Sequence, residues 1–317
     1  MSHAVETHGV RKQYGSLVAV EDLSFVADTG EILGVLGPNG AGKTTAIRML
    51  TTILEPTRGS FSIGGAPHTQ PAEIRRRIGV LPESAGYPES QTGDEYLRYH
   101  ARLFGQSRAS AAATAGALLE EVGLTERRRS RVASYSRGMR QRLGIARALV
   151  NEPRVVFLDE PTLGLDPAGQ RQVLTLVRRI AHERGATVLL STHLLAEVEE
   201  TCSRLLILNR GRVVAEGTVS EVTRLAAAPR SAKIRVGVEH VQRALDMLTI
   251  APGVERVAAA GPPGCLTVTS SATGGRSGEE LLNGGLRAVV DASIPVLSFE
   301  LEGARLSDAF LAMTEAV

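Results

Sequence analysis

The sequence predicts an α/β fold with a largely parallel sheet, followed by a small α+β domain. At 317 residues the chain is too long for one ordinary hydrophobic core. Short apolar runs alternate with helical patterns between residues 31 and 193, which is typical of strands joined by crossover helices. The composition then shifts at 221–231 and period-two alternation follows. We therefore expect two domains, 1–222 and 223–317.

The first elements are two strands and a helix. Apolar residues predict strands at 16–27 and at 31–37 (EILGVLG). The helix that follows should end near Leu54, because Pro56 disfavours helical geometry in the residue before it. TRGSFSIGG, at 57–65, predicts a short strand close to a turn.

A helical pattern runs from about residue 93 to 123, and a further helix reaches Val150, so we expect a helical subdomain at about 88–150. VVFL, at 155–158, is a short apolar run typical of a strand buried on both faces. An amphipathic helix at 172–185 separates it from a second buried strand.

That second strand is ATVLLSTH, at 186–193, and LLILNRGRVVAEG, at 205–217, predicts a hairpin around its Asn-Arg-Gly turn. Beyond the boundary the pattern is strand, helix, strand, a possible further strand, helix, strand, helix. The expected strands are 232–239, 265–270 and 297–301, and the expected helices are 240–248, 278–290 and one that starts near Ser307.

The overall charge excludes a general polyanion-binding surface, since 36 Lys and Arg against 34 Asp and Glu leave a net charge of +2. Seven arginines at 127–142 form a local cluster. Such a cluster is more often a solvated helix face than a nucleic-acid site.

The two cysteines, Cys202 and Cys265, are too few for a disulfide framework or a cysteine-based zinc site. The first residues contain no apolar signal segment, and no run of 18 apolar residues occurs. These features predict a cytoplasmic protein that does not span a membrane by itself.

GPNGAGKT, Gly37–Thr44, is the strongest motif. It matches G-x4-GK-[ST] and lies between a strand and a helix, where its backbone N–H groups can surround phosphate oxygens. Lys43 should reach the β- and γ-phosphates, and the Thr44 hydroxyl should bind Mg²⁺. The predicted ATP-binding residues of this stretch are Gly37, Pro38, Asn39, Gly40, Ala41, Gly42, Lys43, Thr44 and Thr45.

Two later motifs add polar groups at strand ends. The run VVFLDEP ends a buried strand in Asp159, placed to hold Mg²⁺, and Glu160, placed to polarise an attacking water. The next strand ends in Ser-Thr-His, and parallel strands bring His193 to the same sheet edge as the phosphate loop.

The order and spacing of six motifs resemble the ATP-binding-cassette (ABC) ATPases over residues 3–220. They are Tyr14, GPNGAGKTT, SRGMRQR, LDEP, GLD and STH. The resemblance implies a P-loop NTPase (RecA-like) ABC cassette with antiparallel β and helical subdomains. It also implies ATP and Mg²⁺ as cofactors.

The resemblance also implies roles for individual residues. Tyr14 would stack on adenine, and Asp166 would lie at the contact between two cassettes. Ser136 and Gly138 belong to the signature motif, which contacts the γ-phosphate of ATP bound to a second cassette. Glu160 resembles the general base. Lys43 and His193 complete the expected catalytic residues.

Two departures point to one branch of the family. Glu83 occupies the usual glutamine position, and the signature is SRGM in place of the commoner SGGQ. Both resemble the drug, lipid and polysaccharide exporters that include daunorubicin-resistance-type ATPase subunits, as does the appended domain. We expect Glu83 to face the metal with Thr44 and Asp159.

The expected function is therefore an ATPase subunit that powers a hydrophobic-drug, lipid or polysaccharide exporter. The partners would be separate transmembrane permease subunits and a second copy of the chain, without nucleic acid, at the cytoplasmic face of the membrane. The alternative is a non-transport cassette that acts as an ATP-driven switch on nucleic acid or ribosomes. A GTPase is excluded, since no Asn-Lys-x-Asp occurs.

Overall fold

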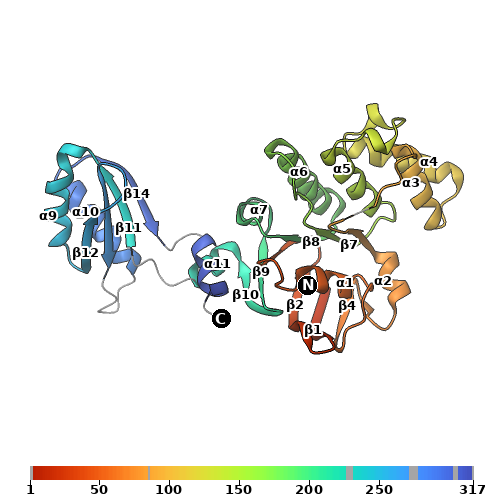
Figure 1. Ribbon diagram of the computed structural model, residues 1–317, viewed down its shortest axis with the longest axis horizontal. Coiled ribbons are helices and arrows are strands. Elements are labelled where there is room, and N and C mark those ends of the chain that lie inside the picture. The colour runs from red at the N-terminus through yellow and green to blue at the C-terminus, as the bar shows by residue number, and fades with distance from the viewer. Residues whose placement is uncertain (1–2, 85, 226–230, 271–277, 303–305, 316–317) are drawn as a thin grey trace. The chain divides into compact units, whose positions relative to one another are not determined.

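The computed structural model describes residues 3–84, 86–225, 231–270, 278–302 and 306–315. The chain forms two compact units, Met1–Val219 and Ser220–Val317 (Figure 1). Each unit has its own hydrophobic core.

A parallel sheet forms the centre of the first unit. Its strands lie in the order β9-β3-β8-β7-β6. Every residue of β3, β7 and β8 is buried, as expected for strands covered on both faces. The bounds are β3 Ile32–Leu36, β6 Ile78–Leu81, β7 Val155–Asp159, β8 Thr187–Thr192 and β9 Arg204–Asn209.

The sheet continues in the order β5-β4-β1-β2-β10, in which β5, β4, β1 and β2 are antiparallel neighbours and β2 pairs in parallel with β10. The hairpin of β9 with β10 confirms the predicted turn at 209–211. Strand β1 has no counterpart in the sequence prediction, because its irregular register interrupts the period-two pattern. The bounds are β1 His3–Tyr14, β2 Leu17–Asp28, β4 Arg58–Ile63, β5 Ala66–Pro67 and β10 Arg212–Thr218.

The first helix is shorter than predicted. Helix α1 spans Lys43–Leu50, so the expected end near Leu54 is wrong. The Thr51 hydroxyl donates to the Ile47 carbonyl, and Thr52 has a φ of 61°, outside the right-handed helical region. The other helices packed with this sheet or following it are α2 Pro71–Arg77, α6 Pro167–Arg184, α7 Leu195–Thr201 and α8 Val219–Leu225.

Three helices, α3 Gly93–Leu103, α4 Arg108–Glu121 and α5 Arg137–Ala148, pack together as a helical subdomain (Figure 1). Two 3₁₀ turns, Thr125–Arg127 and Val132–Ser134, connect α4 to α5. Leu97, Leu119 and Tyr135 are among its buried side chains.

The second unit is a four-stranded antiparallel sheet in the order β12-β13-β11-β14, with α9 and α10 packed on it. The chain order β-α-β-β-α-β includes the further strand that the sequence left open. Of the helices in the described residues, none is long and apolar enough to cross a membrane. The bounds are β11 Ser231–Val236, α9 Val241–Thr249, β12 Val254–Ala259, β13 Cys265–Ser270, α10 Gly278–Asp291, β14 Val296–Glu302 and α11 Leu306–Glu315, with a 3₁₀ turn at Val238–His240.

Candidate active site

The glycine-rich loop joins β3 to α1 and is pressed against neighbouring backbone. A Cβ on Gly37 would lie 2.4 Å from the Leu208 carbonyl oxygen, and one on Gly42 would lie 2.6 Å from that of Ala19. Gly42 also has a φ of 104°, which favours glycine. The loop therefore has no room for a side chain at these two positions. The N–H groups in the first turn of α1 have no acceptor within the helix.

Lys43 is the buried cation of this loop, with 7% of its surface exposed. Its Nζ donates to the carbonyl oxygens of Gly37 at 2.6 Å and Pro38 at 3.4 Å. The same atom lies 3.6 Å from Glu160 Oε1. These backbone contacts hold the ammonium group against the first residues of the glycine-rich loop.

Asp159 ends β7 and is 2% exposed. One of its carboxylate oxygens accepts a 2.6 Å hydrogen bond from the hydroxyl of Ser191 on the neighbouring strand β8. This contact fixes the orientation of the carboxylate at the carboxyl end of β7.

Glu160 follows Asp159 and has a φ of 48°, which is uncommon for a residue other than glycine. Its N–H donates to the Ser191 carbonyl at 3.1 Å. Its Oε2 lies 2.8 Å from Nδ1 of His193, so one carboxylate links the lysine of the loop to the histidine. Such local strain is typical of residues held in a functional geometry.

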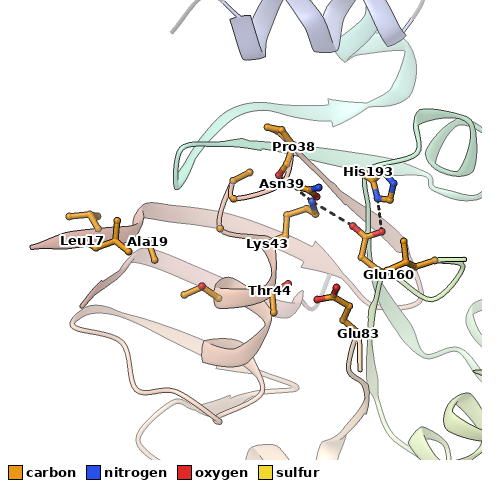
Figure 2. Close-up of a pocket in the computed structure, with 15 residues that line it drawn as sticks. Leu17, Ala19, Pro38, Asn39, Lys43, Thr44, Glu83, Glu160 and His193 are labelled. Carbon is orange, nitrogen blue, oxygen red and sulfur yellow. Dashed lines mark hydrogen bonds and ion pairs between the residues drawn. The ribbon is translucent and has the colours of Figure 1, made fainter. Parts of the chain in front are cut away.

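Lys43, Glu160 and His193 face one cavity of about 490 Å³ (Figure 2). In Figure 2, Glu160 lies between Lys43 and His193, with dashed lines to both, and Glu83 extends towards Thr44. The lining consists of Leu17, Val18, Ala19, Pro38, Asn39, Gly40, Ala41, Gly42, Lys43, Thr44, Thr45, Glu83, Glu160, Leu163 and His193. Gly37 precedes this lining, and Asp159 lies beside it.

Thr44, Glu83 and Asp159 also line an adjoining cavity of about 80 Å³. Hydroxyl and carboxylate oxygens are ligands that Mg²⁺ prefers. Within the described part of the chain, no three His, Cys, Asp or Glu residues are grouped to enclose a metal ion. One hydroxyl and two carboxylates suit Mg²⁺, which is usually bound through one or two carboxylates together with phosphate and water oxygens.

The segment after Glu83 reaches the helical subdomain. Tyr87 packs on Tyr96 with ring centroids 5.8 Å apart, and burial raises the pKa of Tyr87 to about 12. A Cβ on Gly144 of α5 would lie 2.4 Å from the Tyr87 hydroxyl oxygen. Close packing therefore holds Tyr87, four residues after Glu83, against α5.

Besides Gly37 and Asp159, four predicted site residues lie outside the cavity lining of the single chain. Tyr14 is 44% exposed, and Lys12 Nζ lies 5.2 Å from its ring centre. Ser136 caps α5 by accepting from the Met139 N–H at 3.2 Å, and Gly138 lies in the first turn of that helix. In the same way, the Asp166 side chain caps α6 by accepting from the Gly169 N–H at 3.2 Å.

Four apolar residues of the lining were not predicted from the sequence: Leu17, Val18, Ala19 and Leu163. The first three belong to a predicted strand, but nothing in the sequence distinguished them from other strand residues. Their position follows from the pairing of β2 with neighbouring strands, which brings Ala19 against Gly42.

Comparison with known proteins gives consistent matches. A family model described as ABC transporter matches residues 20–163. The daunorubicin/doxorubicin resistance ATP-binding protein DrrA of Streptomyces peucetius is 37% identical, with 99% of this chain and 93% of that protein covered. The Nod factor export ATP-binding protein I of Paraburkholderia xenovorans is 42% identical, with 68% of this chain and 71% of that protein covered.

Solved structures match about 70% of the chain. The structure of an ATP-binding subunit of an ABC transporter has a TM-score of 0.63 at 37% identity and covers 70% of this chain and 92% of its own. A dimeric ATP-binding cassette in a post-hydrolysis state, bound to ADP and Pi, has a TM-score of 0.62 at 25% identity. That match covers 68% of this chain and 98% of the other.

Proposed function

Because this chain belongs to the ABC transporter family and is the ATP-binding subunit of an exporter, we propose that two copies enclose two ATP molecules and power export through separate transmembrane subunits. Its ATP hydrolysis is coupled to transport. The alternative of a switch on nucleic acid or ribosomes is not favoured, since the similar proteins include exporter subunits.

One observation carries the proposed chemistry: Glu160 faces the cavity between Lys43 and His193. We assign Glu160 as the base that orients and deprotonates the attacking water. Lys43 and the loop N–H groups stabilise negative charge on the transferring phosphoryl group, and His193 contacts the γ-phosphate. The loop residues Gly37–Thr45 hold the phosphates, and Tyr14 supports adenine beside Leu17–Ala19.

The second copy supplies what the single-chain cavity lacks. Ser136 and Gly138 lie at the N-terminus of α5, where helix N–H groups favour an anion. In our proposal they reach the γ-phosphate of ATP on the partner copy, and Asp166 lies at the contact between the copies. ATP then favours the closed pair, because only that state binds it from both sides.

Mg²⁺ would be held by Thr44 and Asp159, with Glu83 as a third oxygen donor. When bound, it would neutralise charge on the phosphate groups. The family usually has glutamine, with a neutral amide, at this position. The carboxylate of Glu83 therefore adds one negative charge to the oxygen donors for Mg²⁺.

We predict that Glu83→Gln raises the Mg²⁺ concentration for half-maximal ATPase activity by roughly three- to tenfold, because a neutral amide attracts the cation less strongly. Phosphate release across a Mg²⁺ titration measures this shift. Glu89→Gln makes the same change at an exposed residue outside the lining and should leave the titration unaltered. Equal curves for both variants and the unchanged protein would remove Glu83 from the metal site.

The exported molecule is proposed from the similar proteins. Their names refer to resistance to daunorubicin and doxorubicin and to Nod factor export. We propose an amphiphilic substrate that carries a substantial apolar portion, such as a hydrophobic drug, a lipid or a lipid-linked polysaccharide. The chain would act at the cytoplasmic face of the membrane.

Purification of the tagged chain from host membranes in mild detergent tests the transporter proposal. We expect a polytopic membrane protein to co-purify in stoichiometric amounts and to stimulate or restrain its ATPase activity. Recovery of ribosomal proteins or nucleic acid without a membrane protein would leave the ATP site intact but contradict the proposed transport.

A further inference from the structure

A buried carboxylate that the proposed chemistry does not use lies next to the site. Glu197, on the short helix α7, is 5% exposed. Its Oε2 accepts a hydrogen bond of 2.7 Å from the Thr192 hydroxyl. In the described part of the chain its Oε1 is buried and has no hydrogen-bond partner. Burial of a carboxylate is costly, so this position calls for a physical reason.

Thr192 ends β8 immediately before His193 and is fully buried. Its hydroxyl donates to Glu197 and accepts from the Leu194 N–H at 3.0 Å. The backbone on both sides of His193 is therefore tied to one hydroxyl, and Glu197 fixes the direction in which that hydroxyl points.

Helix α7 is itself fixed against the strand that leads to the glycine-rich loop. A Cβ on Gly34 of β3 would lie 3.0 Å from Cys202 Sγ and 3.2 Å from Val198 Cγ1. Burial, and then the charge of Glu197, raises the pKa of the Cys202 thiol to about 12. Close packing of Val198 and Cys202 on β3 therefore fixes the helix that carries Glu197 against the sheet.

Three consecutive residues at the end of β8 each contact a different carboxylate. Ser191 donates to Asp159, Thr192 donates to Glu197, and His193 lies 2.8 Å from Glu160. Asp159 and Glu160 belong to the proposed site, whereas Glu197 approaches the same strand end from α7. The His193 ring thus contacts Glu160, while the residue before it is held by Glu197.

We infer that Glu197 is a positioning residue for ATP hydrolysis, which acts through the Thr192 hydroxyl to set the orientation of His193 towards Glu160 and the γ-phosphate. The inference rests on the proposed function of His193 and Glu160. A hydrogen bond to a charged acceptor is shorter and stronger than one to a neutral acceptor, so a carboxylate holds the hydroxyl more rigidly than a neutral acceptor would.

The test removes the hydroxyl and keeps the shape of the side chain. Thr192→Val is expected to lower kcat by roughly 10- to 100-fold, because a small displacement of a catalytic group costs this much, with the KM for ATP changed less than about threefold. Thr192→Ser restores the hydroxyl and should recover most of the rate. Thermal unfolding of each variant shows whether it is folded.

A matched pair on α7 tests the carboxylate itself. Glu197→Ala is expected to lower kcat as Thr192→Val does, whereas Glu199→Ala, at an exposed position on the same helix, should leave it unchanged. The two changes Thr192→Val and Glu197→Ala should not add when combined, since both break one contact. Additive losses would contradict the inference.

A second readout separates positioning from general damage. In a His193→Ala chain, Thr192→Val should lower the residual single-turnover rate no further, because the contact acts through His193. An equal fractional loss in both backgrounds would overturn the inference. Ring NMR signals of His193, assigned by their absence in His193→Ala, should shift in Thr192→Val while those of the other histidines stay unchanged. Unshifted His193 signals would also overturn it.

Failure of this inference is distinguishable from failure of the proposed function. If Glu160→Gln stops hydrolysis but Thr192→Val and Glu197→Ala turn over normally, only the role of Glu197 is wrong. If Glu160→Gln itself hydrolyses ATP normally, the proposed chemistry is wrong, and the role of Glu197 falls with it.

Discussion

Glu160→Gln is expected to lower the ATPase rate by about 100- to 10,000-fold, which is the usual contribution of a general base. Glutamine keeps the shape of the side chain and a hydrogen-bonding oxygen, but it does not accept the proton from water at neutral pH. Lys43 loses its charged neighbour at 3.6 Å and keeps its carbonyl contacts, so the loop should still bind ATP.

Phosphate release and equilibrium binding of ATP together check this result. Glu126→Gln, at an exposed position in the helical subdomain, makes the same chemical change away from the cavity and should behave as the unchanged protein. Normal turnover by Glu160→Gln would remove this residue from the mechanism, and loss of ATP binding would assign it a structural role instead.

Gly138→Asp is expected to lower the ATPase rate by at least about 100-fold, because a carboxylate would repel the γ-phosphate of the partner's ATP. The folding of the single chain should be unaffected. A Cβ on Gly138 would meet only Leu165 Cδ2 within 4 Å, at an ordinary contact distance of 3.9 Å. The residue also lies within helix α5, where an L side chain fits the backbone. Each chain should therefore fold and bind ATP with its own loop.

The matched control is Gly116→Asp on α4, since a Cβ there would meet nothing within 4 Å. It adds the same charge to another helical glycine of the same subdomain. We expect full activity for Gly116→Asp and ATP binding without turnover for Gly138→Asp. Equal activity of the two variants would show that the N-terminus of α5 does not contact ATP.

Much of the catalytic edge could be predicted from the sequence, because its residues follow buried strands. The glycine-rich loop, Asp159-Glu160 and His193 each come after a short apolar run, and parallel strands bring such ends together. The structure accordingly places Lys43, Glu160 and His193 around one cavity. The predicted α/β fold is confirmed by the observed sheet and by the matching cassette structure. It could be predicted because alternating strands and helices indicate a parallel sheet.

The remaining features depend on contacts that no local pattern reports. Strand β1 is irregular in register, so its alternation is lost. The end of α1 depends on the Thr51 hydroxyl and on the left-handed backbone of Thr52. The left-handed backbone conformation of Glu160 and the buried hydrogen bond between Thr192 and Glu197 arise only when β7, β8 and α7 pack together.

The roles of Ser136, Gly138 and Asp166 stay predictions for a different reason. Within one chain, Ser136 and Asp166 cap the N-termini of α5 and α6, and Gly138 lies in the first turn of α5. Such roles occur at the start of many helices and do not by themselves indicate a ligand. A role in ATP binding needs a second copy, so the association of two chains is the point on which the proposal depends.

Sedimentation velocity of Glu160→Gln, with bound ATP counted on the same samples, tests that claim most directly. We expect a dimer that holds two ATP molecules in the presence of Mg²⁺ and ATP, and a monomer with ADP or without nucleotide. Adding Gly138→Asp to the same chain should keep it monomeric with ATP still bound. A Glu160→Gln protein that binds ATP at saturation and stays monomeric would show that ATP does not join two copies of this chain.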